Sequence, residues 1–426
     1  MKKIYFYIFS ILISNLAISQ SQTKRCGFNE LRQALLEQYP GLEENWQKIE
    51  QQIQENTHHP PKNGSNFVIP VVVHVLYNTS IPASNISDEQ ILSQINKLNW
   101  DFQRLNADTG NTPNSFKTVA ADTKISFCLA QRDPNGNWTN GITRTQTNKT
   151  QFNINTDDAK FTSQGGKDGW PSDQYLNIWV VPSISGGVLG YATFPGGPAN
   201  RDGVVIAYRY FGDREQQSNF GKTFSLSSPY DKGRTATHEV GHWLGLYHIW
   251  GDDNGACSGS DYVNDTPNQA DETYGCPSSP QISCNNGPDG DMFQNYMDYS
   301  DDGCMNLFTA GQATRMQTVL STTRSTILLS QGCVSTSVDD YALEEHLVIF
   351  PNPANNFTNI KLSIPNKNNI DMIIYDITGK TVLKEHFLSN GDFEYKINTE
   401  NLPNGIYWLK ISTGQQQTVQ RLMIYH

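Results

Sequence analysis

The residues best suited to chemistry in this chain lie in one stretch that begins at His238. His238 and His242 are four residues apart, so on a helix both imidazoles project from the same face and can share one metal ion. Gly245 lets the backbone leave that helix, and His248 then offers a third imidazole. Three neutral imidazoles with a fourth position left open are typical of a catalytic zinc, whereas a structural zinc has four protein ligands. The spacing therefore predicts a catalytic zinc site.

Three further residues are predicted to work with this metal. Glu239 follows the first histidine and would lie beside the open position, where it can act as a general base towards water. About fifty residues beyond His248, Met297 is expected to form a turn beneath the histidines, although an isolated methionine is more often only part of a core. Tyr299 is expected to bring its hydroxyl near the metal and to stabilise an oxyanion. Together these residues predict zinc-assisted hydrolysis.

Two other interpretations of the motif remain open. The histidines could be core residues with satisfied hydrogen bonds, but the glycine and the third histidine make the pattern much more specific than two histidines alone. The main rival function is a zinc-containing surface adhesin or binding protein with weak catalysis or none. Glu239 argues against that function, because a structural or binding site has no need of a general base.

The N-terminus predicts export. Lys2 and Lys3 precede an apolar run over residues 4–17, which indicates a signal peptide over residues 1–19. That run is too short to span a bilayer and no later stretch is long and apolar enough, so we expect no integral membrane segment. The net charge of -11 and the pI near 5.3 argue against nucleic acid as a partner. Export also makes disulfides the default state of paired cysteines.

A polar segment over residues 20–62 is predicted to be a propeptide with two helical pieces, at 31–38 and 42–54. It carries Cys26, and with seven cysteines in the chain one must stay unpaired by disulfides within it. A thiolate is a good zinc ligand, so a propeptide cysteine can replace the catalytic water and keep an enzyme latent. The alternative is a thiol that pairs elsewhere or has no role.

Residues 63–335 are predicted to form one α/β domain. An apolar run at 67–77 indicates a buried strand, in which His74 is expected to be a core residue. A capping box at Ser87 begins a long amphipathic helix, and further strands and a closing helix are expected at 125–131, 175–181, 204–210 and 309–329. This order places a twisted sheet over the active-site helix. A glycine-rich strand at 186–194 could pair with an extended substrate, although such strands are nearly as often structural.

The region 251–290 is rich in Asp, Asn, Gly, Ser and Pro and has little apolar periodicity. Such a loop-rich subdomain needs disulfides or calcium to hold it, and its acidic residues offer hard oxygen ligands: Asp252, Asp253, Asp261, Asp265 and Asp271, with Thr266 as a possible further donor. An ordinary acidic loop is the alternative. Cys333 could reach Cys128 and tie the end of the domain to its sheet.

A linker at 336–346 is expected to lead to a separate module at 347–426. Short alternating strands and turns predict a small β-sandwich there, with no catalytic cluster. Glycan binding by this module is the weaker alternative function, since it shows no cluster of aromatic residues.

Three segments of the chain resemble the pappalysin family of metzincin metallopeptidases, in particular its ulilysin-like bacterial members. They are HEVGHWLGLYHIW at 238–250, DTP at 265–267 and NYMDYSDD at 295–302, and the resemblance spans roughly residues 67–332. It implies an α/β metzincin catalytic domain with a loop-rich C-terminal subdomain. It also implies a secreted zinc endopeptidase with zinc on the three histidines, a general base at Glu239, a methionine turn at Met297 and Tyr299 beside the metal.

The resemblance has finer implications as well. It places calcium near Asp261, Asn264 and Thr266, with Asp265 adjacent, and it pairs Cys257 with Cys284 and Cys276 with Cys304. It implies that Cys26 blocks the zinc of a latent zymogen. It implies a preference for Arg or Lys just after the cleaved bond, held by Asp302, since a buried carboxylate selects a basic side chain. Protein or peptide substrates follow from it.

The tail resembles the C-terminal sorting domains of type IX secretion cargo at 350–354, 375–380 and 402–407. This implies export through the periplasm by the type IX machinery, to the cell surface or the medium. The basic-residue preference also predicts propeptide cleavage before Lys62. Between Arg324 and Lys361 there is no Lys or Arg, so the enzyme is not expected to cut its own linker.

Overall fold

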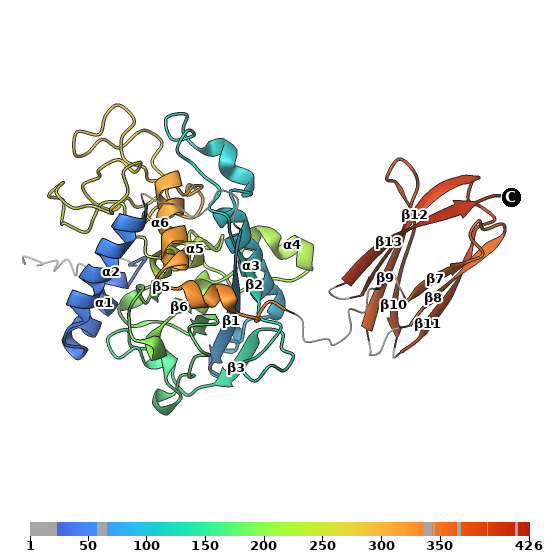
Figure 1. The fold of residues 1–426 in the computed structure, drawn as a ribbon, viewed down its shortest axis with the longest axis horizontal. Coiled ribbons are helices and arrows are strands. Elements are labelled where there is room, and N and C mark those ends of the chain that lie inside the picture. The colour runs from blue at the N-terminus through green and yellow to red at the C-terminus, as the bar shows by residue number, and fades with distance from the viewer. Residues whose placement is uncertain are drawn as a thin grey trace, which may run out of the picture. The chain divides into compact units, whose positions relative to one another are not determined.

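The computed structural model describes residues 24–57, 66–334, 343, 346–363, 368–389, 391–413 and 416–426. The chain divides into two compact units, Met1–Thr336 and Ser337–His426, both drawn in Figure 1. The division falls at the linker predicted from composition, while the domain boundaries themselves stay predictions. The signal peptide at 1–19, the Lys62 cleavage site and most of the linker lie outside the described residues.

A mixed sheet forms the centre of the first unit. Its strands run in the order β2-β1-β4-β6-β5, and β3 also pairs with β1. All pairs are parallel except that β5 is antiparallel to β6. Nearly every residue of β1 is buried, as expected for a valine-rich strand covered on both faces. The strands are β1 Phe67–Tyr77, β2 Ile125–Leu129, β3 Ile142–Gln146, β4 Leu176–Val181, β5 Gly190–Ala192 and β6 Val204–Ala207.

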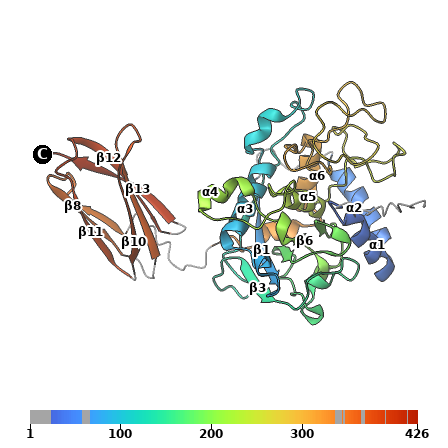
Figure 2. The same cartoon turned by 180° about the vertical axis from the view of Figure 1, so that it is seen from behind.

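Two helices pack against this sheet and against each other. Helix α3 (Asp88–Phe102) lies beside β2, and α5 (Arg234–Trp243) lies beside β5 and β6. The side chain of Ser87 accepts a hydrogen bond from the backbone N–H of Gln90, which caps α3 where the sequence predicts its start. The sheet-over-helix arrangement predicted from the element order is confirmed, and Figure 2 shows it from behind. Helices α4 (Gln217–Phe220) and α6 (Ala310–Ser321) also belong to this unit.

The predicted propeptide contains helices α1 (Phe28–Gln38) and α2 (Leu42–Thr57). Helix α1 packs beside β5, and α2 packs against α6. Figure 1 shows both in blue along one side of the unit. Their apolar residues Leu31, Leu35 and Trp46 belong to the same buried core as the sheet. The segment is therefore folded onto the first unit.

No helix or strand occurs between α5 and α6, so this region depends on disulfides. Two of them lie within it, Cys257–Cys284 and Cys276–Cys304. A third, Cys128–Cys333, joins β2 to the end of the unit. The first two are the pairs that the family resemblance implies, and the third is the pair suggested for the end of the domain. Cys26 is free and buried.

The second unit is a small β-sandwich of antiparallel strands, as predicted. One sheet has the order β10-β9-β12-β13 and the other β11-β8-β7, and side chains from both sheets share one core. Its strands are β7 Leu347–Phe350, β8 Phe357–Leu362, β9 Asn368–Tyr375, β10 Thr381–Ser389, β11 Phe393–Asn398, β12 Gly405–Thr413 and β13 Gln416–Ile424. Among the helices of the described residues, none has the length and apolar character needed to cross a membrane.

Candidate active site

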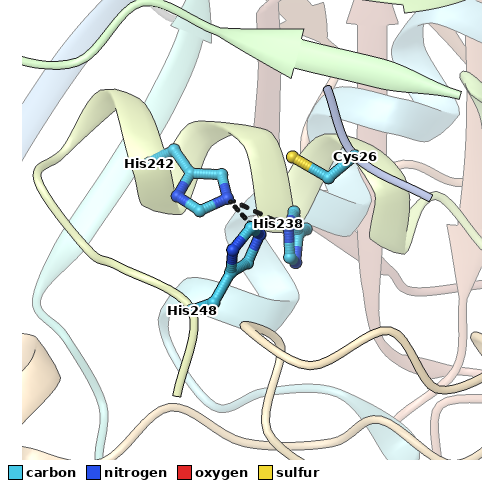
Figure 3. A group of neighbouring side chains, drawn as sticks. All are labelled: Cys26, His238, His242 and His248. Atoms are coloured by element: carbon cyan, nitrogen blue, oxygen red, sulfur yellow. Dashed lines mark hydrogen bonds between the residues drawn. The ribbon is translucent and has the colours of Figure 1, made fainter. Parts of the chain in front are cut away.

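Three histidine rings meet at one point beside helix α5. Nε2 of His242 lies 3.1 Å from Nε2 of His238 and 3.1 Å from Nε2 of His248. Figure 3 shows the three rings pointing towards one another. His238 and His242 share a face of the helix, and the chain leaves it through Gly245, whose φ of +88° few other residues adopt readily. All three residues are fully buried.

Hydrogen bonds at the opposite ring nitrogens set the tautomers of these rings. Nδ1 of His238 donates to the backbone oxygen of Tyr296 and Nδ1 of His242 to that of Leu246, both at 2.7 Å. The Nε2 atoms are then left as lone-pair donors. Burial lowers the pKa of His238 and of His242 well below the ordinary value, so both rings are neutral.

Asp252 holds the third ring, a role the sequence did not predict. Nδ1 of His248 lies 2.8 and 3.0 Å from the two carboxylate oxygens of Asp252. Burial acts to raise the pKa of that carboxyl, but the neighbouring His248 outweighs it and brings the pKa to about 2. The sequence instead predicts Asp252 as one of the oxygen ligands of the acidic loop. The spacing of four residues between His248 and Asp252 is the sequence signal that could have predicted this contact.

The donor set fits a zinc ion. Two nitrogens bound to one zinc at about 2 Å lie roughly 3.3 Å apart in a tetrahedron, close to the separations observed here. Neutral imidazoles fixed by second hydrogen bonds are the usual zinc ligands. Sγ of Cys26 joins the group, because this sulfur and the ring nitrogens of the three histidines all lie within 4.8 Å of one another. Within the described part of the chain, no other group of three or more His, Cys, Asp or Glu donors comes this close together.

Glu239 lies next to this group, and only one of its two carboxylate oxygens accepts a hydrogen bond. Oε2 accepts a hydrogen bond from Sγ of Cys26 at 3.4 Å, and Oε1 has no hydrogen-bond partner among the described residues although it is buried. Burial raises the pKa of the Glu239 carboxyl to about 8. A Cβ at Gly190 would lie 2.9 Å from Cγ of Glu239, so strand β5 needs a glycine to pass this closely. The group can exchange a proton with a molecule beside it.

The segment around Cys26 lies along strand β5. It forms a parallel bridge with Gly190, and the backbone N–H of Gly27 donates to the oxygen of Gly190 at 2.9 Å. The N–H of Leu189 donates to the oxygen of Lys24 at 3.2 Å. A Cβ at Gly27 would come within 2.3 Å of Ile154, so the close fit requires glycine there. The glycine-rich strand therefore pairs with an extended segment of the same chain.

Met297 and Tyr299 are both close to the histidines. Met297 is fully buried under α5, where a Cβ at Gly241 would meet its sulfur at 2.5 Å. The ring of Tyr299 lies 5.7 Å from that of His238 and 5.0 Å from that of His248, centroid to centroid. Its hydroxyl donates to the backbone oxygen of Cys26 at 3.4 Å. Both side chains are thus next to the ligand set.

Asp302 is buried at the start of α5 and holds an arginine. Nη2 of Arg25 donates to Oδ1 of Asp302 at 2.9 Å, and both side chains are fully buried. The guanidinium also lies 5.0 Å from the ring centroid of Tyr230. Oδ2 of Asp302 accepts the backbone N–H groups of Lys232 and Arg234. A basic side chain therefore fills a carboxylate-floored pocket one residue away from Cys26.

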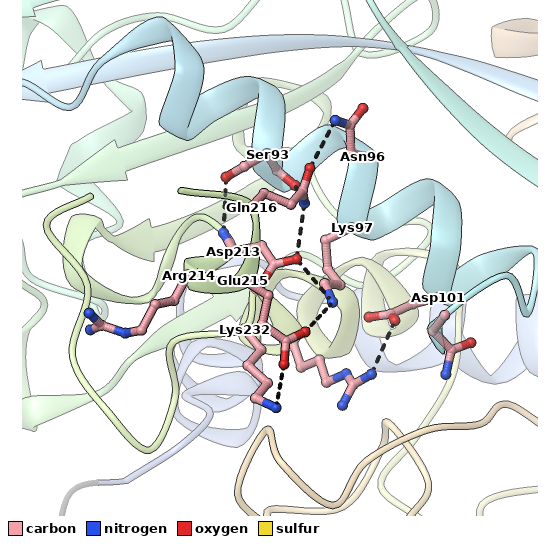
Figure 4. A network of polar contacts seen from close by, with 12 residues as sticks. Ser93, Asn96, Lys97, Asp101, Asp213, Arg214, Glu215, Gln216 and Lys232 are labelled. Carbon is pink, nitrogen blue, oxygen red and sulfur yellow. Dashed lines mark hydrogen bonds and ion pairs between the residues drawn. The ribbon is translucent and has the colours of Figure 1, made fainter. Parts of the chain in front are cut away.

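Behind the site, a network of polar contacts joins α3 to the loop at 213–216 (Figure 4). Nζ of Lys97 lies 3.1 Å from Oδ2 of Asp213. Farther along α3, Asp101 accepts hydrogen bonds from the hydroxyls of Thr237 and Tyr296 and lies 3.6 Å from Arg234. Because the Tyr296 carbonyl holds His238, this network positions a ring of the ligand set. Sequence patterns gave no sign of it.

The residues expected near calcium lie close together in the sequence, and both acids among them accept hydrogen bonds within the protein. Asp261 accepts hydrogen bonds from the Val263 N–H and the Thr266 hydroxyl, and burial raises the pKa of its carboxyl to about 7. Asp265 accepts hydrogen bonds from Thr309 and Gly311 at the start of α6. These four carboxylate oxygens are therefore already bonded within the protein. Asn264 lies between the two acids in the same turn.

Two family models match the chain. The model described as "Pregnancy-associated plasma protein-A" matches residues 160–321, and the one described as "Secretion system C-terminal sorting domain" matches residues 348–425. An extracellular metalloprotease of Arthroderma benhamiae is 37% identical over 254 residues, which are 59% of this chain and 77% of that protein.

Two solved structures are also similar to the first unit. Mature mirolysin of Tannerella forsythia, solved with a cleaved peptide, is 52% identical and covers 62% of this chain and 97% of its own, with a TM-score of 0.59. A mutant of promirolysin from the same organism is 47% identical and covers 72% of this chain and 97% of its own, with a TM-score of 0.64.

Proposed function

The chain belongs to the pappalysin family of metalloproteases, and on this basis we propose that it is a zinc endopeptidase made in a latent form. It is an exported enzyme, at the cell surface or outside the cell, with a tail of the secretion-sorting type. The observation that carries the proposal is the meeting of three Nε2 atoms beside the unpaired Oε1 of Glu239.

His238, His242 and His248 would hold the zinc ion through Nε2. When bound, zinc lowers the pKa of water and polarises the carbonyl of the scissile peptide. Glu239 takes a proton from the attacking water and later delivers it to the leaving amine. Tyr299 donates its hydroxyl to the oxyanion that develops on the substrate carbonyl, once the carbonyl of Cys26 no longer accepts that hydrogen bond.

Strand β5 positions the substrate backbone. The Gly190 carbonyl and the Leu189 N–H pair with an extended segment in the latent protein, so they are available to pair with a peptide once that segment leaves. The pro-segment runs parallel to β5. A substrate laid antiparallel to β5 would present its peptide bonds in the opposite direction, which accounts for a pro-segment that occupies the site without being cut there.

Latency rests on Arg25 and Cys26 together. The thiol lies among the histidine nitrogens, where it would serve as the fourth zinc ligand in place of water. The neighbouring arginine anchors the segment on Asp302. Promirolysin covers a larger share of this chain than mature mirolysin does, in line with a removable N-terminal segment.

The pocket that holds Arg25 is proposed to select Arg or Lys just after the cleaved bond. Asp302 offers a buried carboxylate to Arg25, the neighbour of Cys26 in the sequence, and the ring of Tyr230 lies beside the guanidinium. The same preference would release the pro-segment by cleavage before Lys62. Profiling of cleavage sites on a peptide library tests this preference directly.

Exchange of the general base tests the proposed reaction. We expect Glu239→Ala to keep its fold and its zinc and to lose roughly three or more powers of ten in turnover, since alanine cannot take the proton from the attacking water. Turnover on denatured casein is measured together with zinc content on protein freed of its pro-segment by an added protease. Proteolysis within a few-fold of the unsubstituted enzyme would refute the role of Glu239.

Calcium is proposed to stabilise the loop region around Asp261, Asn264, Asp265 and Thr266. The support is the family resemblance and the lack of helices and strands between α5 and α6. We expect EGTA to lower the unfolding temperature of the Glu239→Ala protein and added calcium to restore it. Calcium at a hundredfold excess over its Kd would raise the free energy of unfolding by about 2.7 kcal/mol. The inactive variant excludes autolysis as a cause, and magnesium is the control cation. An unchanged unfolding temperature in EGTA would remove calcium from the proposal.

A further inference from the structure

Arg315 on helix α6 is a buried arginine held in place by residues outside the pro-segment. Its Nε donates to the carbonyl of Gly245, the residue where the chain leaves α5, at 2.7 Å. The guanidinium lies 5.2 Å from the ring centroid of Tyr247 and 5.7 Å from that of Tyr262. Only 1% of the Arg315 side chain is exposed. Three groups thus fix the plane of the guanidinium before any further partner is considered.

The remaining donors of Arg315 bind a carboxylate from the pro-segment. Nη1 donates to Oε1 of Glu50 at 2.8 Å and Nη2 donates to Oε2, so the pair is bidentate. Glu50 lies on α2, within the segment proposed to leave on maturation. The nearby carboxylate of Asp261 is already used by Val263 and Thr266. Departure of α2 therefore leaves a preorganised pair of donors without its carboxylate.

Arg315 lies on the opposite side of the metal centre from the Asp302 pocket. Past Cys26, Phe28 stacks on the ring of His242 at 4.3 Å and meets the ring of Tyr247 at 6.3 Å. Tyr247 then contacts Arg315. These contacts run in the order Arg25 with Asp302, Cys26 with the metal ligands, Phe28 with Tyr247, and Tyr247 with Arg315. Since the pocket takes the residue after the cleaved bond, Arg315 is on the side of the residues before it.

We propose that Arg315, with Tyr247 and Tyr262, forms a carboxylate-binding subsite for an acidic side chain that precedes the cleaved bond. Glu50 fills this subsite in the latent protein. The inference rests on the proposed function, because it needs the pro-segment to leave and the Asp302 pocket to set the direction of the substrate. A planar guanidinium with two parallel N–H donors is matched to Asp or Glu and excludes Lys and Arg by charge.

The chain contains a matched control for Arg315. Arg324 also holds a backbone carbonyl with Nε, that of Trp243 at 2.9 Å, and a carboxylate with its two Nη atoms, that of Asp202. Its guanidinium also lies against an aromatic ring, that of Trp243. Asp202 lies outside the pro-segment, so its carboxylate stays in place on maturation. The two arginines therefore differ in one respect: the carboxylate bound by Arg315 leaves with the pro-segment, and the carboxylate bound by Arg324 remains.

The test compares peptides that share an Arg after the cleaved bond and carry Glu or Gln at each of the four preceding positions. For the mature enzyme we expect kcat/KM to favour Glu over Gln about tenfold at one of these positions. R315Q is expected to bring this ratio to about one, and R324Q to leave it unchanged. The ratio within one variant is independent of any general loss of activity. A ratio near one in the unsubstituted enzyme, or a ratio that R315Q leaves intact, overturns the subsite.

The same experiment separates this inference from the proposed function. If the Gln peptides are cut before Arg but Glu gives no advantage, only the carboxylate subsite fails. If no peptide is cut before Arg, the proposed function itself fails.

A second measurement uses the zymogen. E50Q is expected to shorten the time to full activation several-fold, because the pro-segment loses its charged anchor, whereas E55Q on the exposed face of α2 leaves that time unchanged. Equal activation times for E50Q and the unsubstituted zymogen contradict the occupancy of the subsite by Glu50.

Discussion

Each histidine of the metal centre uses its two ring nitrogens for different purposes. The Nε2 atoms converge, and the Nδ1 atoms bind Tyr296, Leu246 and Asp252. The spacing of the histidines and of Glu239 could be recognised in the sequence because it follows from the pitch of one helix. The Nδ1 partners could not, because two are backbone carbonyls whose positions depend on turns formed later in the chain.

Pairing across distant segments was equally hidden at this scale. The contact of Arg25 with Asp302 joins residues 277 positions apart. Cys26 drew attention in the sequence only as the odd cysteine, whereas the arginine beside it carries no such mark. Asp302 could be predicted as a site residue only from the family resemblance, because its neighbours in the sequence give no sign of that role.

Removal of the thiol is the most direct test of latency. We expect Cys26→Ala zymogen to show proteolysis before any cleavage of its pro-segment, since alanine offers no ligand for the fourth zinc position. Activity in the first minutes is followed with a quenched peptide, while gel electrophoresis reports whether the chain is still intact.

The Cys26→Ala/Glu239→Ala double variant serves as the control for contaminating proteases. Should Cys26→Ala zymogen stay as inactive as the unsubstituted zymogen, latency depends on Arg25 and the helices α1 and α2 alone.

At the scale of elements, the strands and helices were predictable where apolar residues recur at a regular spacing along the chain. The valine-rich β1 and the capped α3 have such patterns. The network around Lys97 and Asp213 was not predictable, because α3 meets the loop at 213–216 only in the folded state. The glycine-rich strand was predicted to pair with an extended peptide, but the sequence did not show that the Cys26 segment would be that peptide.

The buried histidine of β1 makes the stability of the sheet depend on pH. Its ring is held between Thr143 and Asn177, and burial lowers the pKa of His74 to about 4. An unfolded chain binds this proton near pH 6.5, so the unfolded state gains protons first as the pH falls. We expect His74 to cost about 2 kcal/mol of stability between pH 7 and pH 4.5 and to have no such effect above pH 7.

This loss is measured by denaturant unfolding of the Glu239→Ala protein at the two pH values, with and without His74→Gln. Loss of zinc at low pH affects both proteins alike, so the difference between them reports His74. Equal losses in the two proteins would mean that the ring is protonated in the folded state.

At the scale of the whole molecule, the enzyme and its sorting module are separate units. Each has its own buried core, as the change in composition near residue 336 predicts. Strand alternation was enough to predict the sandwich, since one face of each of its sheets is buried. The number of strands in each sheet was not evident, because pairing joins strands that are not neighbours in sequence.

The linker provides the prediction for the intact molecule. No Lys or Arg lies between Arg324 and Lys361, so we expect the purified mature enzyme to keep its tail during long incubation. Ser337→Arg should create a site and release the tail by cleavage before residue 337. Mass spectrometry of the intact protein distinguishes the two. Tail loss at the linker of the unsubstituted enzyme would contradict the basic-residue preference or reveal another peptidase.

Asp302 has a double attachment that bears on how this enzyme can be re-engineered. One carboxylate oxygen faces the pocket, and the other accepts the N–H groups of Lys232 and Arg234 where α5 begins. Exchanging this acid to obtain a new cleavage preference would therefore also disturb the helix that carries two of the histidines. Tyr230 lies against the same guanidinium but is not one of the groups that bind the N–H groups at the start of α5. Laboratory evolution towards other substrates should accordingly collect its changes at Tyr230 and spare the acid.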